Sequence, residues 1–152
     1  MAAQGWGDVR AGMTLDELAA TGIVVKPDER SAGTQEEQAD AEACSIRGVV
    51  GGPENLAIFV ESGVITSVGV SSDQGAPRFV TDRGVGLGDS EAAVRRVYGS
   101  LKQEADIYGG PRDKKLFHRH DGEHGIKFSI VGGTVNAINV GGGSIEYVEG
   151  CS

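Results

Sequence analysis

All three histidines of the chain fall within one short segment, H118-R-H-D-G-E-H124. Imidazole nitrogens bind zinc, copper and nickel, and a carboxylate from Asp121 or Glu123 can complete such a ligand set. This clustering is the strongest chemical signal in the sequence. We therefore take His118, His120 and His124 as candidate metal ligands, with a divalent transition metal as the possible ion.

The relative positions of these histidines depend on the turn that joins two predicted strands. If residues 120–122 form a three-residue loop, His118 faces His124 across the hairpin and His120 lies at the tip. A two-residue turn at 121–122 instead places His118 and His120 on one face and His124 on the other. A polar, solvated turn without any ligand explains the same residues, and we prefer that interpretation because no established metal motif surrounds them.

The two cysteines, Cys44 and Cys151, are the second candidate for chemistry. A disulfide between them would close a loop of over a hundred residues, which the loop-entropy model values at roughly 4–5 kcal/mol. The alternative is two unrelated small residues. We favour the bridge, because a cysteine in a terminal tail is otherwise a reactive liability. A bridge implies an oxidising compartment.

Other motifs favour a protein without catalytic activity. The segment G84-V-G-L-G88-D resembles a phosphate-binding loop but lacks its lysine, so a backbone turn before a helix is the better interpretation. No nucleophile elbow is present, and the acidic run at 36–42 is typical of a solvated face. We expect no enzyme, no catalytic residues and no cofactor.

The elements that must position these residues come from an internal repeat. The segment V9-R-A-G-M-T-L-D-E-L-A-A-T-G22 returns as V85-G-L-G-D-S-E-A-A-V-R-R-V-Y-G99, and each copy leads to a hairpin pattern, at 58–70 and at 128–140. Self-similarity of this kind indicates a repeated structural unit. Each copy opens with a capped short helix, and each hairpin gathers its large apolar residues on one face.

The sequence therefore predicts an α+β fold of two repeats, each a short helix followed by antiparallel strands, with a shared or side-by-side sheet and helices on one face. We expect one domain, 1–152, built from repeat one (5–78) and repeat two (79–152). We take 61–63 and 131–133 as three-residue turns. Further strands are expected near 44–50 and 144–148. Residues 27–43 are predicted to form a solvated loop, with a helical turn within it as the alternative.

Charge and hydropathy exclude several partners. The net charge of −8 argues against nucleic acid, which requires a basic patch, and against anionic lipid. No apolar run reaches the length of a membrane span, and the first residues show neither the charged nor the apolar region of a signal peptide. The charge is compatible with a basic protein partner.

Both copies begin with the same pattern: two apolar residues separated by one position, then Gly, then Met or Asp, then Thr or Ser, then a short helix. This start resembles the SmpA/OmlA outer-membrane assembly lipoproteins and the tandem units of β-lactamase inhibitory protein. The segment G84-V-G-L-G-D-S-E-A-A-V-R-R-V-Y-G99 and the ending Y147-V-E-G-C151 are similar to uncharacterised secreted or lipoprotein-like bacterial proteins. These resemblances imply a fold and an envelope location, and they supply no catalytic residues.

Our leading hypothesis is a non-enzymatic bacterial envelope or secreted protein, periplasmic or extracellular, that binds another protein through its sheet face or loops. Inhibitor, immunity and assembly-factor roles fall within it. The alternative is a metal-binding module at His118, His120 and His124. A hydrolase with an active site assembled from distant residues is a third possibility.

Overall fold

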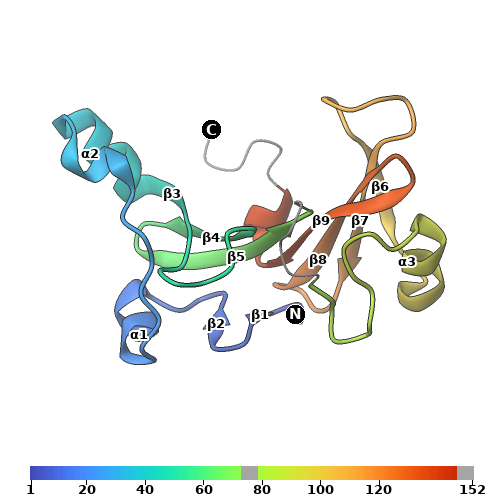
Figure 1. Ribbon diagram of the computed structural model, residues 1–152, viewed down its shortest axis with the longest axis horizontal. Helices are drawn as coiled ribbons and strands as arrows, with labels where there is room; N and C mark the ends of the chain where they lie inside the picture. The colour runs from blue at the N-terminus through green and yellow to red at the C-terminus, as the bar shows by residue number, and fades with distance from the viewer. Residues whose placement is uncertain (73–78, 147–152) are drawn as a thin grey trace.

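The computed structural model describes residues 1–72 and 79–146 and has the predicted α+β class. Two- and seven-stranded antiparallel sheets combine with short helices (Figure 1). In chain order the elements are β1 (Gly5–Trp6), β2 (Val9–Arg10), α1 (Leu15–Ala20), the 3₁₀ helix η1 (Glu29–Ala32), α2 (Gln35–Ala43), β3 (Cys44–Arg47), β4 (Leu56–Glu61), β5 (Val64–Ser71), α3 (Glu91–Tyr98), β6 (Lys102–Ala105), β7 (Lys114–Arg119), β8 (Gly125–Val131), β9 (Thr134–Gly141) and the 3₁₀ helix η2 (Gly143–Glu146).

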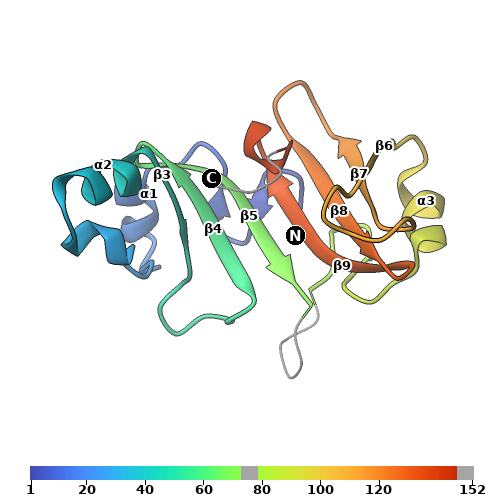
Figure 2. The ribbon, with the colours of Figure 1, turned by 90° about the horizontal axis from the view of Figure 1, so that it is seen from above.

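The large sheet joins both predicted hairpins in the strand order β3-β4-β5-β9-β8-β7-β6. Strands β5 and β9 pair antiparallel at its centre, so the hairpins β4–β5 and β8–β9 lie on either side of one seam. Figure 2 shows β3, β4 and β5 on the left of this seam and β9, β8 and β7 on the right.

Both hairpins turn through two residues instead of the predicted three. Glu61 pairs with Val64, and Val131 pairs with Thr134. Ser62 has a φ of 49° and is followed by Gly63 at 78°, which is the left-handed pair that a type I′ turn requires. The second hairpin meets the same need with two glycines.

A bulge in each hairpin makes the strand pairing differ from the predicted register. The pairing shifts between Phe59 and Val60 in the first hairpin and between Ser129 and Ile130 in the second. The extra residue restores large apolar side chains to one face after the shorter turn. Ile58 consequently faces Val68, whereas the three-residue turn predicted a different partner.

The two turns are braced by the same backbone contacts. Thr14 and Ser90 are the N-caps of α1 and α3, and their hydroxyls accept bonds from the amides of Glu17 and Ala93. In both cases the chain just before the helix pairs with the first residues of the second hairpin strand. The matched N–H···O bonds are Gly12 to Ile65 (2.7 Å) and Gly88 to Val135 (2.9 Å), Ile65 to Met13 (2.7 Å) and Val135 to Asp89 (2.8 Å), and Leu15 to Gly63 and Glu91 to Gly133 (both 3.0 Å).

Pairing between β5 and β9 is symmetric about one position. Counted from the two turns, Gly69 and Asn139 occupy corresponding places, and these two residues pair with each other. The flanking pairs Val68 with Val140 and Val70 with Ile138 are the same pair read in opposite directions. A twofold relation between the hairpins requires this register.

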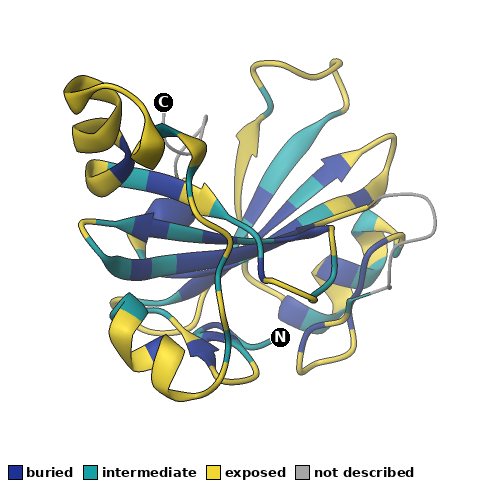
Figure 3. Cartoon of the chain, turned by 60° about the vertical axis from the view of Figure 1, so that its left-hand side comes forward, coloured by how far each residue is buried: buried dark blue, intermediate teal, exposed yellow. Residues whose placement is uncertain are grey.

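The hydrophobic core lies between one face of the sheet and the elements below it in Figure 1, namely α1, the β1–β2 hairpin and α3. Its largest fully buried side chains come from the sheet, α1 and β2, and α3 adds Val94 and Tyr98: Phe128, Leu18, Leu56, Ile58, Ile65, Leu116, Ile126, Ile130 and Ile138, with Val9. Figure 3 shows this burial concentrated along the strands, while α2 is almost wholly exposed. We call the opposite side of the large sheet the outer face.

Two segments differ from the prediction. Residues 27–43 contain more helix than the single turn allowed in the predicted loop, namely η1 and α2, because Thr34 and Glu37 form a capping box that starts α2. The described part of the predicted strand at 144–148 is η2, and residues 147–148 lie outside the described residues. The strand expected near 44–50 is present as β3.

None of the helices in the described ranges is both long enough and apolar enough to cross a membrane.

Candidate functional site

The hairpin that carries the histidines has a different register from the one that would pair them. Arg119 faces Gly125 and His118 faces Ile126, so residues 120–124 form the connection. The amide of His120 donates to the carbonyl oxygen of His124 at 3.0 Å and closes it. The loop is longer than either predicted turn, and His118 therefore does not face His124.

His118 belongs to the core side of the sheet. Its ring lies 4.7 Å from the ring of Tyr98, whose hydroxyl donates to Thr81 Oγ1 at 2.7 Å. Burial, reinforced by nearby Arg83, lowers the pKa of His118. Burial also raises the pKa of Tyr98, which is 6% exposed. These groups pack α3 against β7, which is a structural role for the imidazole.

His124 and His120 stay in the connecting loop. His124 Nδ1 lies 3.2 Å from both carboxylate oxygens of Asp121. Asp121 Oδ1 also accepts hydrogen bonds from the backbone amides of Glu123 and His124, both at 2.7 Å. These amides hold the pKa of Asp121 below its usual value. Over residues 1–72 and 79–146, no group of three or more His, Cys, Asp or Glu side chains is placed to hold a metal ion.

Cys44 begins β3 and is half-buried, with its carbonyl oxygen accepting a bond from Arg30 Nη2 at 2.7 Å. Cys151 lies outside the described residues. The Cys44–Cys151 bridge therefore stays a prediction.

The outer face is built differently from the core side. Strand alternation assigns three rows of cross-strand neighbours to it, and small side chains occupy the middle of the sheet. Phe59 and Phe117 are half-buried, and Ile46 at the edge is 47% exposed. The middle row runs Ala57, Gly69, Asn139, Lys127, Phe117 and Lys102.

Lys127 is the residue that stands out on this face. It lies in β8 between Phe117 and Asn139 of the neighbouring strands, and it is only 8% exposed. Among residues 1–72 and 79–146 its ammonium has no hydrogen-bond or ion-pair partner. Burial lowers the pKa of Lys127 to about 8, and the positive charge of Lys115 adds to this effect, while the negative charges of Asp106 and Glu104 oppose it. The side chain is largely covered while its ammonium still reaches solvent, and a lysine covered this far without an ion-pair partner in the described ranges is unusual for a purely structural residue.

The other charges of this region are held at its rim. Lys102 Nζ lies 3.0 Å from Glu104 Oε1 and 5.7 Å from the centre of the Phe117 ring. Arg119 Nη2 lies 3.3 Å from Glu146 Oε1. These exposed pairs contribute little to stability, but they fix the orientation of cations beside the aromatic ring.

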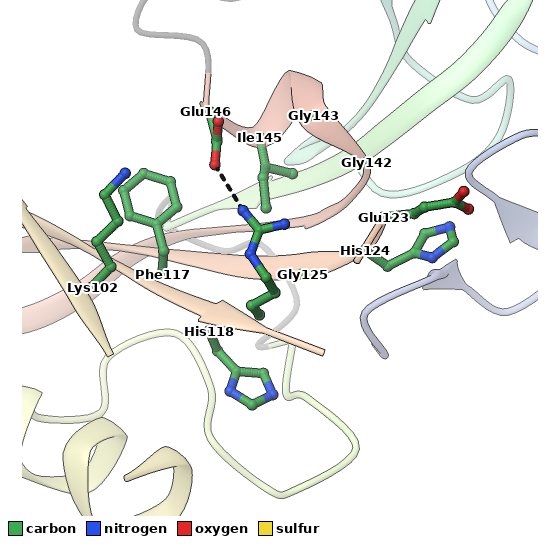
Figure 4. Close-up of a pocket in the computed structure, with 11 residues that line it drawn as sticks. Lys102, Phe117, His118, Glu123, His124, Gly125, Gly142, Gly143, Ile145 and Glu146 are labelled. Carbon is green, nitrogen blue, oxygen red and sulfur yellow. Dashed lines mark hydrogen bonds and ion pairs between the residues drawn. The ribbon is translucent and has the colours of Figure 1, made fainter. Parts of the chain in front are cut away.

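A small groove of about 80 Å³ opens where η2 crosses the end of β7 and β8 (Figure 4). Phe117, Ile145 and Glu146 lie on its side of the strand, while His118 points to the opposite side. Ser144 Oγ donates to Ser67 Oγ at 2.8 Å and holds η2 against β5. The groove thus continues the outer face and does not include a set of convergent acids or bases.

A larger hollow of about 590 Å³ lies between α1, α2 and the edge of the sheet. Alanines of α2, Leu15 and Val60 supply most of its lining, with Arg47 and Glu42 as its charged residues. Nothing in this lining is arranged for a proton transfer or a nucleophilic attack.

Lys127 was not among the sequence candidates. In the strand segment I126-K-F128 a lysine between two apolar residues is typical of a solvated outer face. That interpretation places Lys127 on the correct side of the sheet. Its depth of burial depends on neighbouring strands and could not be read from the segment.

No protein-family model, no curated protein and no solved structure matches this chain.

Proposed function

We propose that this chain is a non-enzymatic bacterial envelope or secreted protein that binds another protein through the outer face of its large sheet. The observation that carries the proposal is the composition of that face. Small residues along the seam allow close approach, and half-exposed Phe59, Phe117 and Ile46 supply apolar contact area. Aromatic residues, phenylalanine among them, are enriched in protein–protein interfaces.

The proposed architecture is two copies of a helix-plus-hairpin unit joined at the β5–β9 seam. The matched caps and backbone bonds that brace the two turns support it, as does the symmetric register about Gly69 and Asn139. A duplicated unit of this kind provides a wide, continuous sheet surface for a partner without requiring an enclosed pocket.

Partner capture tests the proposed function. Immobilised protein is incubated with bacterial envelope and secreted fractions, and bound proteins are identified by mass spectrometry. Ala57→Arg places a bulky charge on the outer face, and Ala20→Arg is the matched control on exposed α1. We expect one partner that wild type and Ala20→Arg retain and that Ala57→Arg loses by at least tenfold in affinity.

Two results would contradict the proposal. A partner retained equally by Ala57→Arg would move the binding surface away from the outer face. A specific turnover activity, with no specific partner, would replace the binding function altogether. Circular dichroism of Ala57→Arg shows whether any loss comes from unfolding.

The secreted or periplasmic location depends on the predicted Cys44–Cys151 bridge and on the family resemblance. Intact mass after thiol alkylation, with and without reductant, tests the bridge. We expect no alkylation before reduction and two alkylated thiols after it. Two readily alkylated thiols without reductant would remove the argument for an oxidising compartment.

A further inference from the structure

We infer that Lys127 is the anchor for a carboxylate on an acidic segment of the partner protein. This inference rests on the proposed function and specifies the chemistry of the partner. It starts from a side chain that is more than nine-tenths buried, on the face proposed for binding, with no partner among residues 1–72 and 79–146.

The local charges favour an anion at this position. Lys115 lies diagonally across the β7–β8 pair from Lys127, since Lys115 faces Ser129 and Lys127 faces Phe117. Diagonal neighbours on one face are about 7–8 Å apart. Glu104 lies directly opposite Lys115 but pairs with Lys102. Neither Lys115 nor Lys127 forms an ion pair in the described ranges, so one carboxylate above Ser129 could contact both.

The surroundings favour a protein segment over a longer polyanion. Glu104 and Glu146 flank the cations, and the chain carries a net charge of −8, which repels nucleic acid and anionic lipid beyond the immediate site. Ser129 and Ala137 are small, so a peptide backbone can approach the sheet closely. Phe117 beside Lys127 offers apolar contact to the stem of an inserted Asp or Glu.

Packing of the Lys127 side chain favours the proposed contact. A carboxylate that reaches this partly buried ammonium forms a charge-assisted hydrogen bond beside the apolar ring of Phe117. The stem of Lys127 is already packed in the free protein, so binding costs little additional side-chain ordering. The same carboxylate meeting an exposed lysine such as Lys26 would gain much less.

The test uses the full chain and two synthetic probes, acetyl-Gly-Glu-Asp-Gly-amide and its uncharged analogue acetyl-Gly-Gln-Asn-Gly-amide. Each is titrated at low salt and pH 7 into ¹⁵N-labelled protein, and amide chemical shifts are followed. We expect saturable shifts of Lys127, Ser129 and Asn139 with the acidic peptide only. Lys127→Met should weaken this binding at least tenfold, and Lys26→Met, which removes one exposed charge, should change it less than twofold.

Several outcomes would overturn the anchor. They are unchanged peptide affinity in Lys127→Met, shifts confined to other surfaces, and equal shifts at Lys127 produced by inorganic phosphate or by anionic vesicles. Thermal unfolding of Lys127→Met confirms that the variant is folded.

The proposal of Lys127 as the anchor and the proposal of the outer face as the binding surface can be rejected independently. A captured partner that Ala57→Arg loses but Lys127→Met retains would reject the anchor and leave the outer face as the binding surface. A partner that both variants retain would reject the outer face itself.

Discussion

The hairpins β4–β5 and β8–β9 are alike on the core side and differ on the outer face. Their core positions carry matched apolar residues, such as Ile58 and Phe128. On the outer face, the places held by Ala57 and Gly69 in the first hairpin are held by Lys127 and Asn139 in the second. The shared features are those that folding requires, and the outer-face difference is therefore the natural place to look for function.

Loss of either matched core residue should have the largest effect. We expect Phe128→Ala to cost about 4 kcal/mol and Ile58→Ala about 3 kcal/mol of unfolding free energy, because both leave cavities in a fully buried site. Denaturant unfolding followed by circular dichroism and by the fluorescence of Trp6 should give one coincident transition. Separate transitions, each sensitive to only one variant, would mean that the two hairpins do not share a core.

Lys127→Met should stabilise the free protein by about 1–3 kcal/mol at pH 7, because it replaces a partly buried charge, without an ion-pair partner in the described ranges, with an apolar chain of similar length. Lys26→Met is the matched control and should stay within about 0.5 kcal/mol of wild type. A loss of stability in Lys127→Met would show that the ammonium has a structural partner in the folded protein.

The difference in unfolding free energy between Lys127→Met and wild type should depend on pH. The pKa of Lys127 is lowered in the folded chain from 10.5 to about 8, so the unfolded chain binds the proton more tightly. Protonated Lys127 destabilises the folded chain by about 3 kcal/mol below pH 8. This destabilisation disappears as the pH rises from 8 to 10.5. The stability advantage of Lys127→Met should therefore shrink across this window, and an advantage independent of pH would contradict the account.

The seam between the hairpins should show coupling at its centre. A Cβ at Gly69 would overlap the side-chain amide of Asn139, so Gly69→Ala should cost about 1 kcal/mol. Adding Asn139→Ala should recover most of this cost, and a double-mutant cycle on unfolding free energy measures the coupling. Additive effects would show that the amide moves aside freely.

Removal of the N-cap hydroxyl of α1 or of α3 should lower the unfolding free energy by similar, small amounts. Thr14→Ala and Ser90→Ala each remove a bond to a helix amide, for a loss of about 1 kcal/mol. Ser100→Ala, at an exposed position after α3, should have almost no effect. If Thr14→Ala and Ser90→Ala lower the unfolding free energy by very different amounts, α1 and α3 do not contribute equally to stability.

Local sequence signals predicted the elements better than they predicted the pairing between them. The capped short helix at the start of each copy and the α+β class were correct, because a cap depends on neighbours only a few residues away. Thr34 and Glu37 carry the same local signal for α2, within a segment whose acidic, apolar-poor composition favours a loop.

Register was the main error, and it decided the interpretation of the histidines. A left-handed Ser62 and a bulge after Phe59 are compensating changes that alternation alone does not reveal. At the third hairpin the longer loop separates His118 from His124. Burial of Lys127 depends on strands distant in sequence, so no local pattern could have predicted it.

The most direct measurement is the titration of Lys127 in the free protein by NMR of its side-chain carbon signals, assigned by comparison with Lys127→Met. The account predicts a midpoint near pH 8, well below the ordinary lysine value of 10.5 and below the exposed lysines of the same spectrum. A midpoint at 10 or above would show a fully hydrated or paired ammonium, and it would contradict the claim that the second hairpin presents a partly buried cation with no ion-pair partner in the described ranges on the outer face.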